Sequence, residues 1–349
     1  MRVLAVAVAG VLLLAACGND DDAEPPAETT TTTSSTTTTT EPDEPIVSTF
    51  TGLEIDDEEL NERPAIAVKI ASDRNAQPQV GLSVADVVLE ELVEGGISRF
   101  LAVFQSVDSD PVGPMRSART SEIDLLPLFG QAVFAHSGGN SGTMSAIRSN
   151  PQIINAGPDS AYGGLQFRDN SRRRPNNLFT NTSALREAAL EQASPPTDWF
   201  TFLDVDDDAP EGALPVVGVD VSFGSTNTRW VWDADRNEFL RWQDGREHLD
   251  PEEQQLGFGT VVILGTTYGT SFADPASPEA ITVGGGEAWV VSNGWVVAGT
   301  WERPEVGDRI TLRDGEGEEI PLAPGRIWIS MPRSGAGNVN FLEADPRAE

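Results

Sequence analysis

The chain has 349 residues, with 55 Asp and Glu against 23 Lys and Arg, so its formal net charge at pH 7 is −32. This charge argues against nucleic-acid binding and against adsorption to anionic lipid, because both need a basic surface that neutralises phosphates. With one cysteine and two histidines, the sequence offers no disulfide framework and no cysteine- or histidine-rich metal cluster. We therefore expect no metal and no cofactor.

The first 17 residues have the pattern of a secretory signal peptide. Arg2 precedes an apolar run that is too short to span a membrane, and small residues follow it. The segment ends in L-A-A-C, which resembles the lipobox of bacterial lipoproteins, and the cysteine is Cys17. The alternative is an ordinary signal peptide with a chance cysteine. We predict lipidation of Cys17 by acyl chains such as palmitate, which would attach the protein to the extracytoplasmic face of the cell membrane.

Residues 18–49 are predicted to form a disordered linker. They are rich in Asp and Glu, and the tract from Thr29 to Thr40 contains only Thr and Ser. Such a segment has too little apolar surface to form a core. We expect it to hold the globular part away from the membrane. A second flexible segment is expected at the end of the chain, over residues 336–349.

Residues 50–208 alternate strand patterns with short helical patterns. Apolar strands are predicted within 63–71, 97–107 and 131–135, and helices within 121–129, 143–149 and 182–192. Loops rich in Gly, Ser and Asn follow the strands. This order predicts an α+β or α/β layered domain, and in such sheets ligands bind beyond the carboxyl ends of strands.

Residues 209–335 are predicted to form a β-rich domain. An acidic segment broken by Pro and Gly, 204–215, precedes it and suggests a boundary. Short alternating strands follow, with turn sequences D-A-D-R-N and S-N-G between two of the pairs. The segment is rich in Trp, which suits either a glycan-binding platform or, as the better default, a buried core.

The loop after the second of these strands carries the first candidate site. In V-G-P-M-R-S-A-R, Arg116 and Arg119 flank Ser117, and Arg99 lies in the preceding strand. Guanidinium groups bind carboxylate or phosphate through a planar set of donors. These four residues are candidates for anion binding. The alternative is that the arginines pair internally with Glu90, Glu91, Glu94 or Asp124.

Two further polar sets are candidates. His136, Ser137 and Asn140 follow a strand in H-S-G-G-N-S, and with Glu90 they form a candidate catalytic or polar site. If the two strands are neighbours, this loop and the arginine loop face one crevice. A structural role is the alternative for His136.

The second set lies in the β-rich part and comprises Arg241, His248 and Asp250. We expect these residues first of all to close a hairpin. The basic run 172–174 is either a solvated loop or a flap over the crevice.

The order of motifs resembles the YerB-like family of bacterial lipoproteins, which consist of an N-terminal and a C-terminal domain of unknown function. The matching stretches are R-P-A-I-A-V, G-L-S-V-A-D-V-V-L-E, V-E-G-G-I-S-R-F-L-A-V-F-Q-S, V-G-P-M-R-S-A-R, A-H-S-G-G-N-S, P-N-N-L-F-T, F-L-R-W-Q-D-G-R-E-H-L-D, G-T-W and I-P-L-A-P-G-R-I-W-I. The resemblance implies an exported lipoprotein but no agreed reaction. Two positions depart from the family pattern, since Leu89 stands where relatives have Tyr and Asn176 where they have His.

Three functions fit these observations. The first is an interaction protein of the cell envelope, anchored by lipid, whose partner is a glycan, a phosphorylated ligand or a protein. The second is an envelope enzyme that uses the Arg, Ser and His loops on a phosphoryl or glycan-linked substrate, with a loose similarity to LytR-CpsA-Psr phosphotransferases. In the third, the arginines only hold the fold together. The sequence leaves open whether the protein is an enzyme.

Overall fold

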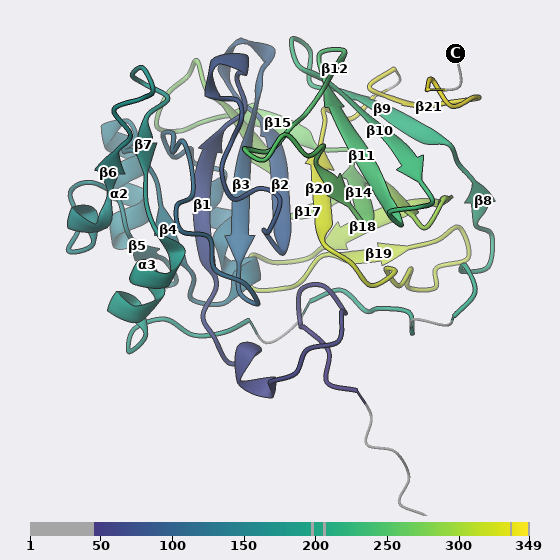
Figure 1. Ribbon diagram of the computed structural model, residues 1–349, viewed down its shortest axis with the longest axis horizontal. Helices are drawn as coiled ribbons and strands as arrows, with labels where there is room; N and C mark the ends of the chain where they lie inside the picture. Colours follow the sequence, from purple (N-terminus) through teal and green to yellow (C-terminus); the bar gives the residue numbers. More distant parts are fainter. Residues whose placement is uncertain (1–44, 197–198, 205–206, 336, 348–349) are drawn as a thin grey trace, which may run out of the picture. The chain divides into compact units, whose positions relative to one another are not determined.

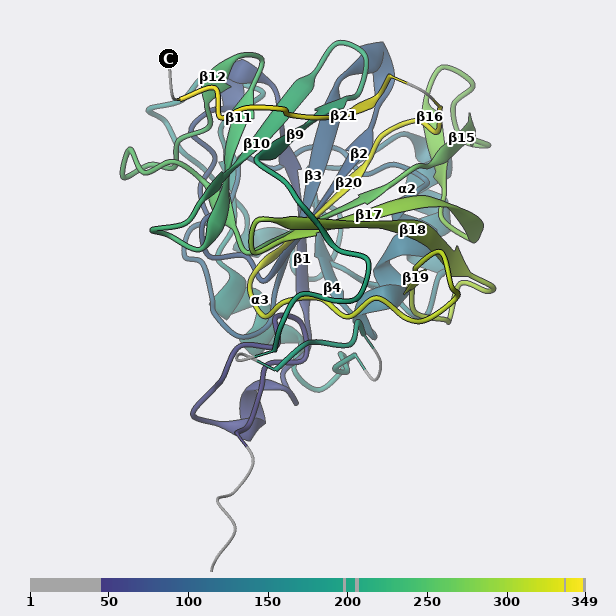
Figure 2. The ribbon, with the colours of Figure 1, turned by 90° about the vertical axis from the view of Figure 1, so that its right-hand side faces the viewer.

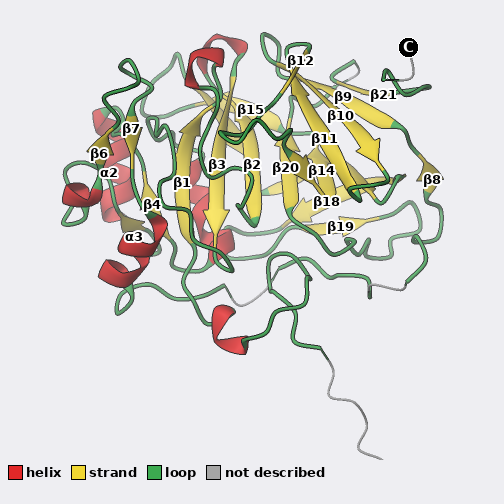
Figure 3. Ribbon diagram, viewed as in Figure 1, coloured by secondary structure: helices red, strands yellow, loops and turns green. Residues whose placement is uncertain are grey.

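The largest feature of the fold is a mixed sheet of eleven strands to which both predicted parts of the chain contribute (Figure 1; Figure 3). Its strands in spatial order are β19 (Thr311–Arg313), β18 (Trp295–Arg303), β17 (Gly284–Ser292), β14 (Thr260–Leu264), β20 (Ile327–Met331), β2 (Val87–Leu92), β3 (Ser98–Phe104), β1 (Ile66–Ala71), β4 (Val133–Ala135) and β5 (Ile154–Asn155), with β8 (Leu214–Pro215) beside β18.

This computed structural model describes residues 45–349 except 197–198, 205–206, 336 and 348–349. The predicted signal peptide, Cys17 and most of the predicted linker lie outside the described residues. Residues 45–349 form one compact unit by their contacts. Within the described part, no helix is long and apolar enough to cross a membrane.

The two parts of the chain meet at the parallel pair β2 and β20. Its register runs from Val87 opposite Ile327 to Glu91 opposite Met331. Both strands are buried along their whole length, and apart from Glu90, Glu91 and Ser330 their residues are apolar, as expected of parallel strands covered on both faces. The division at residues 208 and 209 stays a prediction about the sequence, since the strands of the two parts form one hydrogen-bonded sheet.

A second sheet packs against one face of the first. It consists of β12 (Arg246–Glu247), β11 (Glu238–Gln243), β10 (Asn227–Asp233), β9 (Gly218–Ser222) and β21 (Val339–Phe341), with β13 (Gly257–Phe258) beside β11. Trp230 and Phe239 of this sheet share a core with Phe100 and Trp328 of the large one. The strand β21 lies within 336–349, where the sequence predicts a flexible tail, so pairing with β9 orders these three residues.

The helices are short and lie on both sides of the large sheet. They are α1 (Glu122–Leu125), which continues as the 3-10 helix η4 (Leu126–Phe129), α2 (Ser141–Ser149), α3 (Thr182–Ala189), and the 3-10 turns η1 (Glu58–Leu60), η2 (Arg74–Ala76), η3 (Glu94–Gly96) and η5 (Gly163–Leu165). Figure 2 shows α2 on one side of the central strands and β9 to β11 on the other.

Two separate cores agree with this arrangement. Met144 and Ile147 of α2 belong to one core, and Leu185 of α3 belongs to the other, which also contains the buried side chains of the second sheet. The fold is thus mixed, with a large sheet and few helices. Two hairpins complete it, β15 (Thr267–Thr270) with β16 (Pro278–Ile281) and β6 (Phe167–Arg168) with β7 (Leu178–Phe179).

Candidate functional site

The two loops that the sequence singled out lie side by side. The amide of Ser137 donates to the carbonyl of Arg116 at 3.0 Å, and the amide of Ala118 donates to the carbonyl of Gly138 at 2.9 Å. The amide of Arg116 in turn donates to the carbonyl of Lys69 on β1, at 2.9 Å. The arginine loop (residues 112–121) is therefore fixed between a strand of the large sheet and the loop that leads into α2.

Arg119 makes the internal pair that the sequence left open as an alternative. Its Nε and Nη2 donate to the two carboxylate oxygens of Glu94 at 2.6 and 2.7 Å. Partial burial would raise the pKa of Glu94, but hydrogen bonds from Arg119 and Ser277 hold it at about 2. This guanidinium is already neutralised and is the least suited of the three to bind a ligand.

Arg99 and Arg116 are different. Arg99 is 7% exposed and its Nη1 donates to the carbonyl of Ser117 at 3.0 Å. Burial lowers the pKa of Arg99 to about 10, and the positive charges of Arg119 and Arg116 act in the same direction. Among the described residues, no carboxylate lies within ion-pair distance of Arg99 or of the half-buried Arg116. Two neighbouring cations without a paired anion are thus built into a strongly acidic chain.

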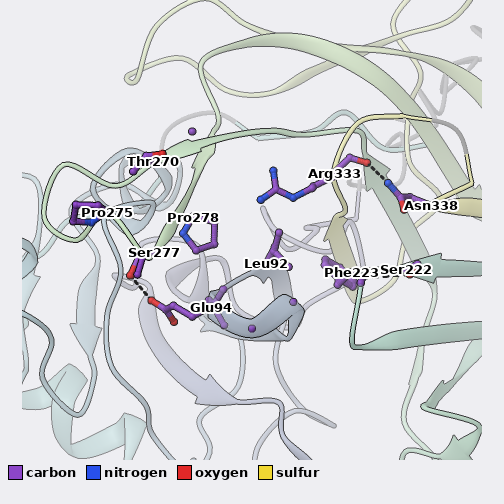
Figure 4. Close-up of a pocket in the computed structure, with 16 residues that line it drawn as sticks. Leu92, Glu94, Ser222, Phe223, Thr270, Pro275, Ser277, Pro278, Arg333 and Asn338 are labelled. Carbon is purple, nitrogen blue, oxygen red and sulfur yellow. Dashed lines mark hydrogen bonds between the residues drawn. The ribbon is translucent and has the colours of Figure 1, made fainter.

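A cavity of about 460 Å³ adjoins the Glu94 turn (Figure 4). Glu94, Gly95 and Gly96 form one wall, and Ser277 and Arg333 contribute from distant parts of the sequence. Figure 4 shows the Glu94 carboxylate turned to Ser277, while the Arg333 side chain enters from the other side. The Arg333 guanidinium stacks 5.1 Å from the ring of Tyr268.

The sequence predicted a turn at Glu94-Gly95-Gly96 but did not single out Ser277 or Arg333 as site residues. Both positions lie more than a hundred residues from the turn, and no local pattern connects them to it.

His136 is held in the interior. It is completely buried, its Nδ1 accepts from the amide of Gly138 at 3.0 Å, and its Nε2 donates to Oδ1 of Asn155 at 2.9 Å. Burial lowers its pKa, although the hydrogen bonds with Asn155 and Gly138 oppose this. Both ring nitrogens are therefore engaged, which is the arrangement expected of a structural histidine.

The two neighbours of His136 in the candidate site have separate roles. Asn140 caps α2, since its Oδ1 accepts from the amide of Thr143 at 2.8 Å. Ser137 is half-buried beside the arginine loop. Glu90, the fourth residue of this candidate set, does not join them.

Glu90 instead forms a buried cluster with Arg241 and His248. Arg241 Nη2 lies 3.0 Å from Glu90 Oε1, and both side chains have no exposed surface. Trp328 Nε1 and Ser98 Oγ also donate to this carboxylate, at 3.0 and 2.6 Å. The cluster ties β2, β3, β11 and β20 together across the two sheets.

Aromatic rings and the imidazole complete the surroundings of Arg241. Its Cζ lies 4.6 Å from the ring of Trp328 and 5.2 Å from that of Phe100. His248 Nδ1 accepts from Arg241 Nη1, and its Nε2 donates to Gln79 Oε1 at 2.8 Å. Burial and the charge of Arg241 lower the pKa of His248 well below its ordinary value.

The third residue of the predicted hairpin set, Asp250, is not part of this cluster. Its Oδ1 accepts from the amides of Glu252 and Gln254 at 3.0 and 2.9 Å. Asp250 therefore closes a local turn, as expected of a residue that stabilises a hairpin connection.

A second buried cluster was not singled out by the sequence analysis. Lys69 of β1, the only lysine, lies between the carboxylates of Glu91 and Glu122, and all three side chains are almost completely buried. One cation can neutralise only one of the two carboxylates. Burial raises the pKa of Glu122 to about 8, and the nearby charge of Glu91 adds to this despite the opposing effect of Lys69. The protonated form is therefore favoured at Glu122, whereas Lys69 lowers the pKa of Glu91.

The fold and these loops define a mixed-sheet protein with an arginine loop beside a polar cavity. Residues 50–195 match the N-terminal domain, and residues 219–329 the C-terminal domain, of "Protein of unknown function (DUF3048)". The chain belongs to this family, which confirms the resemblance seen in the sequence.

Comparisons of sequence and of structure with YerB of Bacillus subtilis support the assignment. The chain is 29% identical over 293 residues to "Putative lipoprotein YerB" of Bacillus subtilis (strain 168), covering 80% of this chain and 84% of the relative. It is also similar to the crystal structure of the YerB protein from Bacillus subtilis, with a TM-score of 0.74 and 25% identity. That comparison covers 85% of this chain and all of the solved one.

Proposed function

We propose that this protein is a lipid-anchored protein of the extracytoplasmic face of the cell membrane that binds an anionic ligand at the arginine loop. The observation that carries the proposal is the pair Arg99 and Arg116, which lie close together with no carboxylate within ion-pair distance in the described part of the chain, although the more distant charges of Glu94 and Glu122 also act on Arg99. Such a pair gains free energy from a bound carboxylate or phosphate, since both offer charge-assisted hydrogen bonds to guanidinium.

The contrast with Arg119 strengthens the proposal. Arg119 is held by a bidentate pair with Glu94, so its charge is already compensated, whereas Arg99 and Arg116 lack such a pair. The amide of Arg116 is fixed to β1 and its carbonyl to Ser137. A backbone held on both sides lowers the entropy cost of positioning the side chain for binding.

The anchor is proposed from Cys17 and from the name of the Bacillus subtilis relative, which calls that protein a lipoprotein. We also propose that residues 18–49 form a disordered linker between this anchor and the folded part, in which the sequence predicts the domains 50–208 and 209–335. The ligand would then be a component of the envelope, such as a phosphorylated or carboxylated glycan.

Binding is favoured over catalysis by the surroundings of the candidate bases. His136 has both ring nitrogens hydrogen-bonded, and Glu90 is fully buried against Arg241. A general base must reach the proton that it removes from the substrate. Neither side chain has free surface for this.

The experiment is a melting curve of residues 45–349 with muramic acid, a carboxylated sugar that carries no phosphate group. A ligand at a hundred times its Kd adds about 2.7 kcal/mol to the free energy of unfolding. We expect a rise in Tm that disappears in Arg116→Ala and persists in Arg148→Ala, which removes an exposed arginine of α2. The proposal fails if the ligand raises the Tm of Arg116→Ala as much as that of the wild type. It also fails if the ligand raises the Tm of neither protein and Arg116→Ala only melts at a lower temperature.

A further inference from the structure

A second cavity, of about 580 Å³, lies in the only dense basic region of the sequence. It is bounded by η2 and by the turn that precedes β7, and it shares no residue with the arginine loop. Its lining residues are Asn75, Gln77, Pro78, Arg172, Arg173, Arg174, Pro175 and Asn176.

Arg172 fixes the floor of this cavity. Its Nη1 and Nη2 donate to the carbonyls of Ala76 and Pro78 at 3.1 and 2.8 Å. Its Cζ lies 5.3 Å from the centroid of the Phe179 ring. The turn is closed further by the amide of Asn176, which donates to the carbonyl of Arg173 at 3.0 Å. The loop is thus attached to η2, and the backbone that carries the next two arginines is held in place.

Arg173 and Arg174 are the unpaired charges of the cavity. Both are exposed, and among the described residues neither has a carboxylate within ion-pair distance. Arginines elsewhere in the described part commonly do have one, and these are Arg63, Arg119, Arg186, Arg229, Arg236, Arg241, Arg309, Arg313, Arg326 and Arg347.

The local charge is opposite to that of the whole protein. The two segments that bound the cavity, 73–78 and 166–177, contain five arginines and two aspartates, whereas the chain carries −32. A concave region lined by one sign of charge raises the local concentration of counter-ions of the opposite sign. The cavity therefore has the electrostatic character of an anion site.

We propose that this cavity binds a phosphorylated, hydroxyl-rich molecule of the size of a sugar phosphate, through Arg173 and Arg174. A phosphate monoester carries a charge of about −1.5 to −2 at pH 7, which matches two guanidinium groups. The amides of Asn75 and Gln77 in the wall supply donors and acceptors for hydroxyl groups. The volume lies within the range of small-molecule sites, about 300 to 1,000 Å³.

A flat anionic membrane surface fits this cavity less well. The site is concave, and the strongly acidic protein around it repels an extended negative surface. The phosphate group can instead belong to a free sugar phosphate or to the end of a larger glycan. The inference is independent of the proposed function at the arginine loop, since the two sites are tested with different variants.

The test is calorimetric titration of residues 45–349, which form a compact unit. The probes are glucose 6-phosphate, glucose, inorganic phosphate and a phosphate-ended oligosaccharide. The variant is Arg173→Ser with Arg174→Ser. The control is Arg148→Ser with Arg246→Ser, which removes the same charge from two exposed arginines that have no ion pair in the described part.

We expect glucose 6-phosphate to bind the wild type with a Kd at or below about 1 mM, and the paired substitution at 173 and 174 to weaken binding at least about tenfold. The control is expected to stay within about twofold of the wild type. Tighter binding of the oligosaccharide would identify the glycan end as the source of the phosphate.

Three results would overturn the proposal. The first is no binding by the wild type, which would leave an ordinary solvated loop. The second is equal weakening in the control, which would mean that only the overall charge matters. The third is inorganic phosphate binding as tightly as glucose 6-phosphate, which would refute the hydroxyl contacts. Unchanged melting curves of both variants without ligand exclude unfolding as the cause.

Discussion

The buried pair of Glu90 and Arg241 gives the sharpest stability prediction. In Arg241→Met the carboxylate of Glu90 keeps its hydrogen bonds from Ser98 and Trp328 but loses its cation in a site with no exposed surface. Removing one partner of a buried ion pair costs about 3–5 kcal/mol. With an unfolding entropy of about 2.1 cal/mol/K per residue, the melting temperature of residues 45–349 should fall by about 5–8 °C.

An exposed pair one strand away provides the matched control. Arg229 of β10 and Asp220 of β9 lie 2.6 Å apart, with side chains 40% and 35% exposed. Surface pairs contribute about 0–1 kcal/mol, so Arg229→Met should lower the melting temperature by less than about 2 °C. Calorimetry of residues 45–349 at one pH measures both. The double variant Glu90→Gln with Arg241→Met should lose less than Arg241→Met alone, because it leaves no unpaired charge. A fall of less than about 2 °C in Arg241→Met would refute the reasoning.

Three further predictions concern other parts of the chain. Burial raises the pKa of Glu122 to about 8, so above about pH 4.5 the folded state keeps a proton that the unfolded chain loses. The free energy of unfolding should therefore decline from about pH 4.5 to 8, by up to about 1.4 kcal/mol per pH unit. In urea titrations Glu122→Gln should remove this decline, and the same pH dependence in the variant and the wild type would contradict the raised pKa of Glu122. Cys17→Ser should abolish labelling by radioactive palmitate in cells, whereas an unlabelled wild type would exclude the anchor. Asn140→Ala removes the cap of α2 and should cost about 1 kcal/mol without changing anion affinity; weaker anion binding would place this amide in the ligand site instead.

The sequence was most informative where the pattern is local. The apolar stretches within 63–71 and 97–107 became β1 and β3, and S-N-G became the connection between β17 and β18. The turn works because Asn293 and Gly294 both adopt positive φ, 44° and 75°, which these two residue types tolerate best. Alternating and turn-specific signals of this kind depend only on neighbouring residues.

The pairing of β2 with β20 had no such signal. The strands are more than two hundred residues apart, and both are buried on both faces, so their apolar residues would suit any buried position in a sheet. That ambiguity explains why the sequence suggested two domains, with a boundary at residues 208 and 209, and gave no sign of a shared sheet.

The candidate residues show why chemistry is harder to predict than strands. Arg116 and Arg119 are three residues apart and have the same side chain, yet one is paired with Glu94 and the other is not. The difference is made by the turn at Glu94-Gly95-Gly96, whose position follows from the β2–β3 register that sets Glu91 opposite Arg99. Glu90 and Glu91 differ in the same way: adjacent in the strand, their side chains point to opposite faces, so one meets Arg241 and the other Lys69. An acidic residue in a sequence therefore identifies neither its partner nor its protonation state until the register and the opposing layer are known. Because Arg99 and Arg116 have no carboxylate within ion-pair distance in the described residues, the search for a ligand at the arginine loop should start with these two guanidiniums rather than with the histidines.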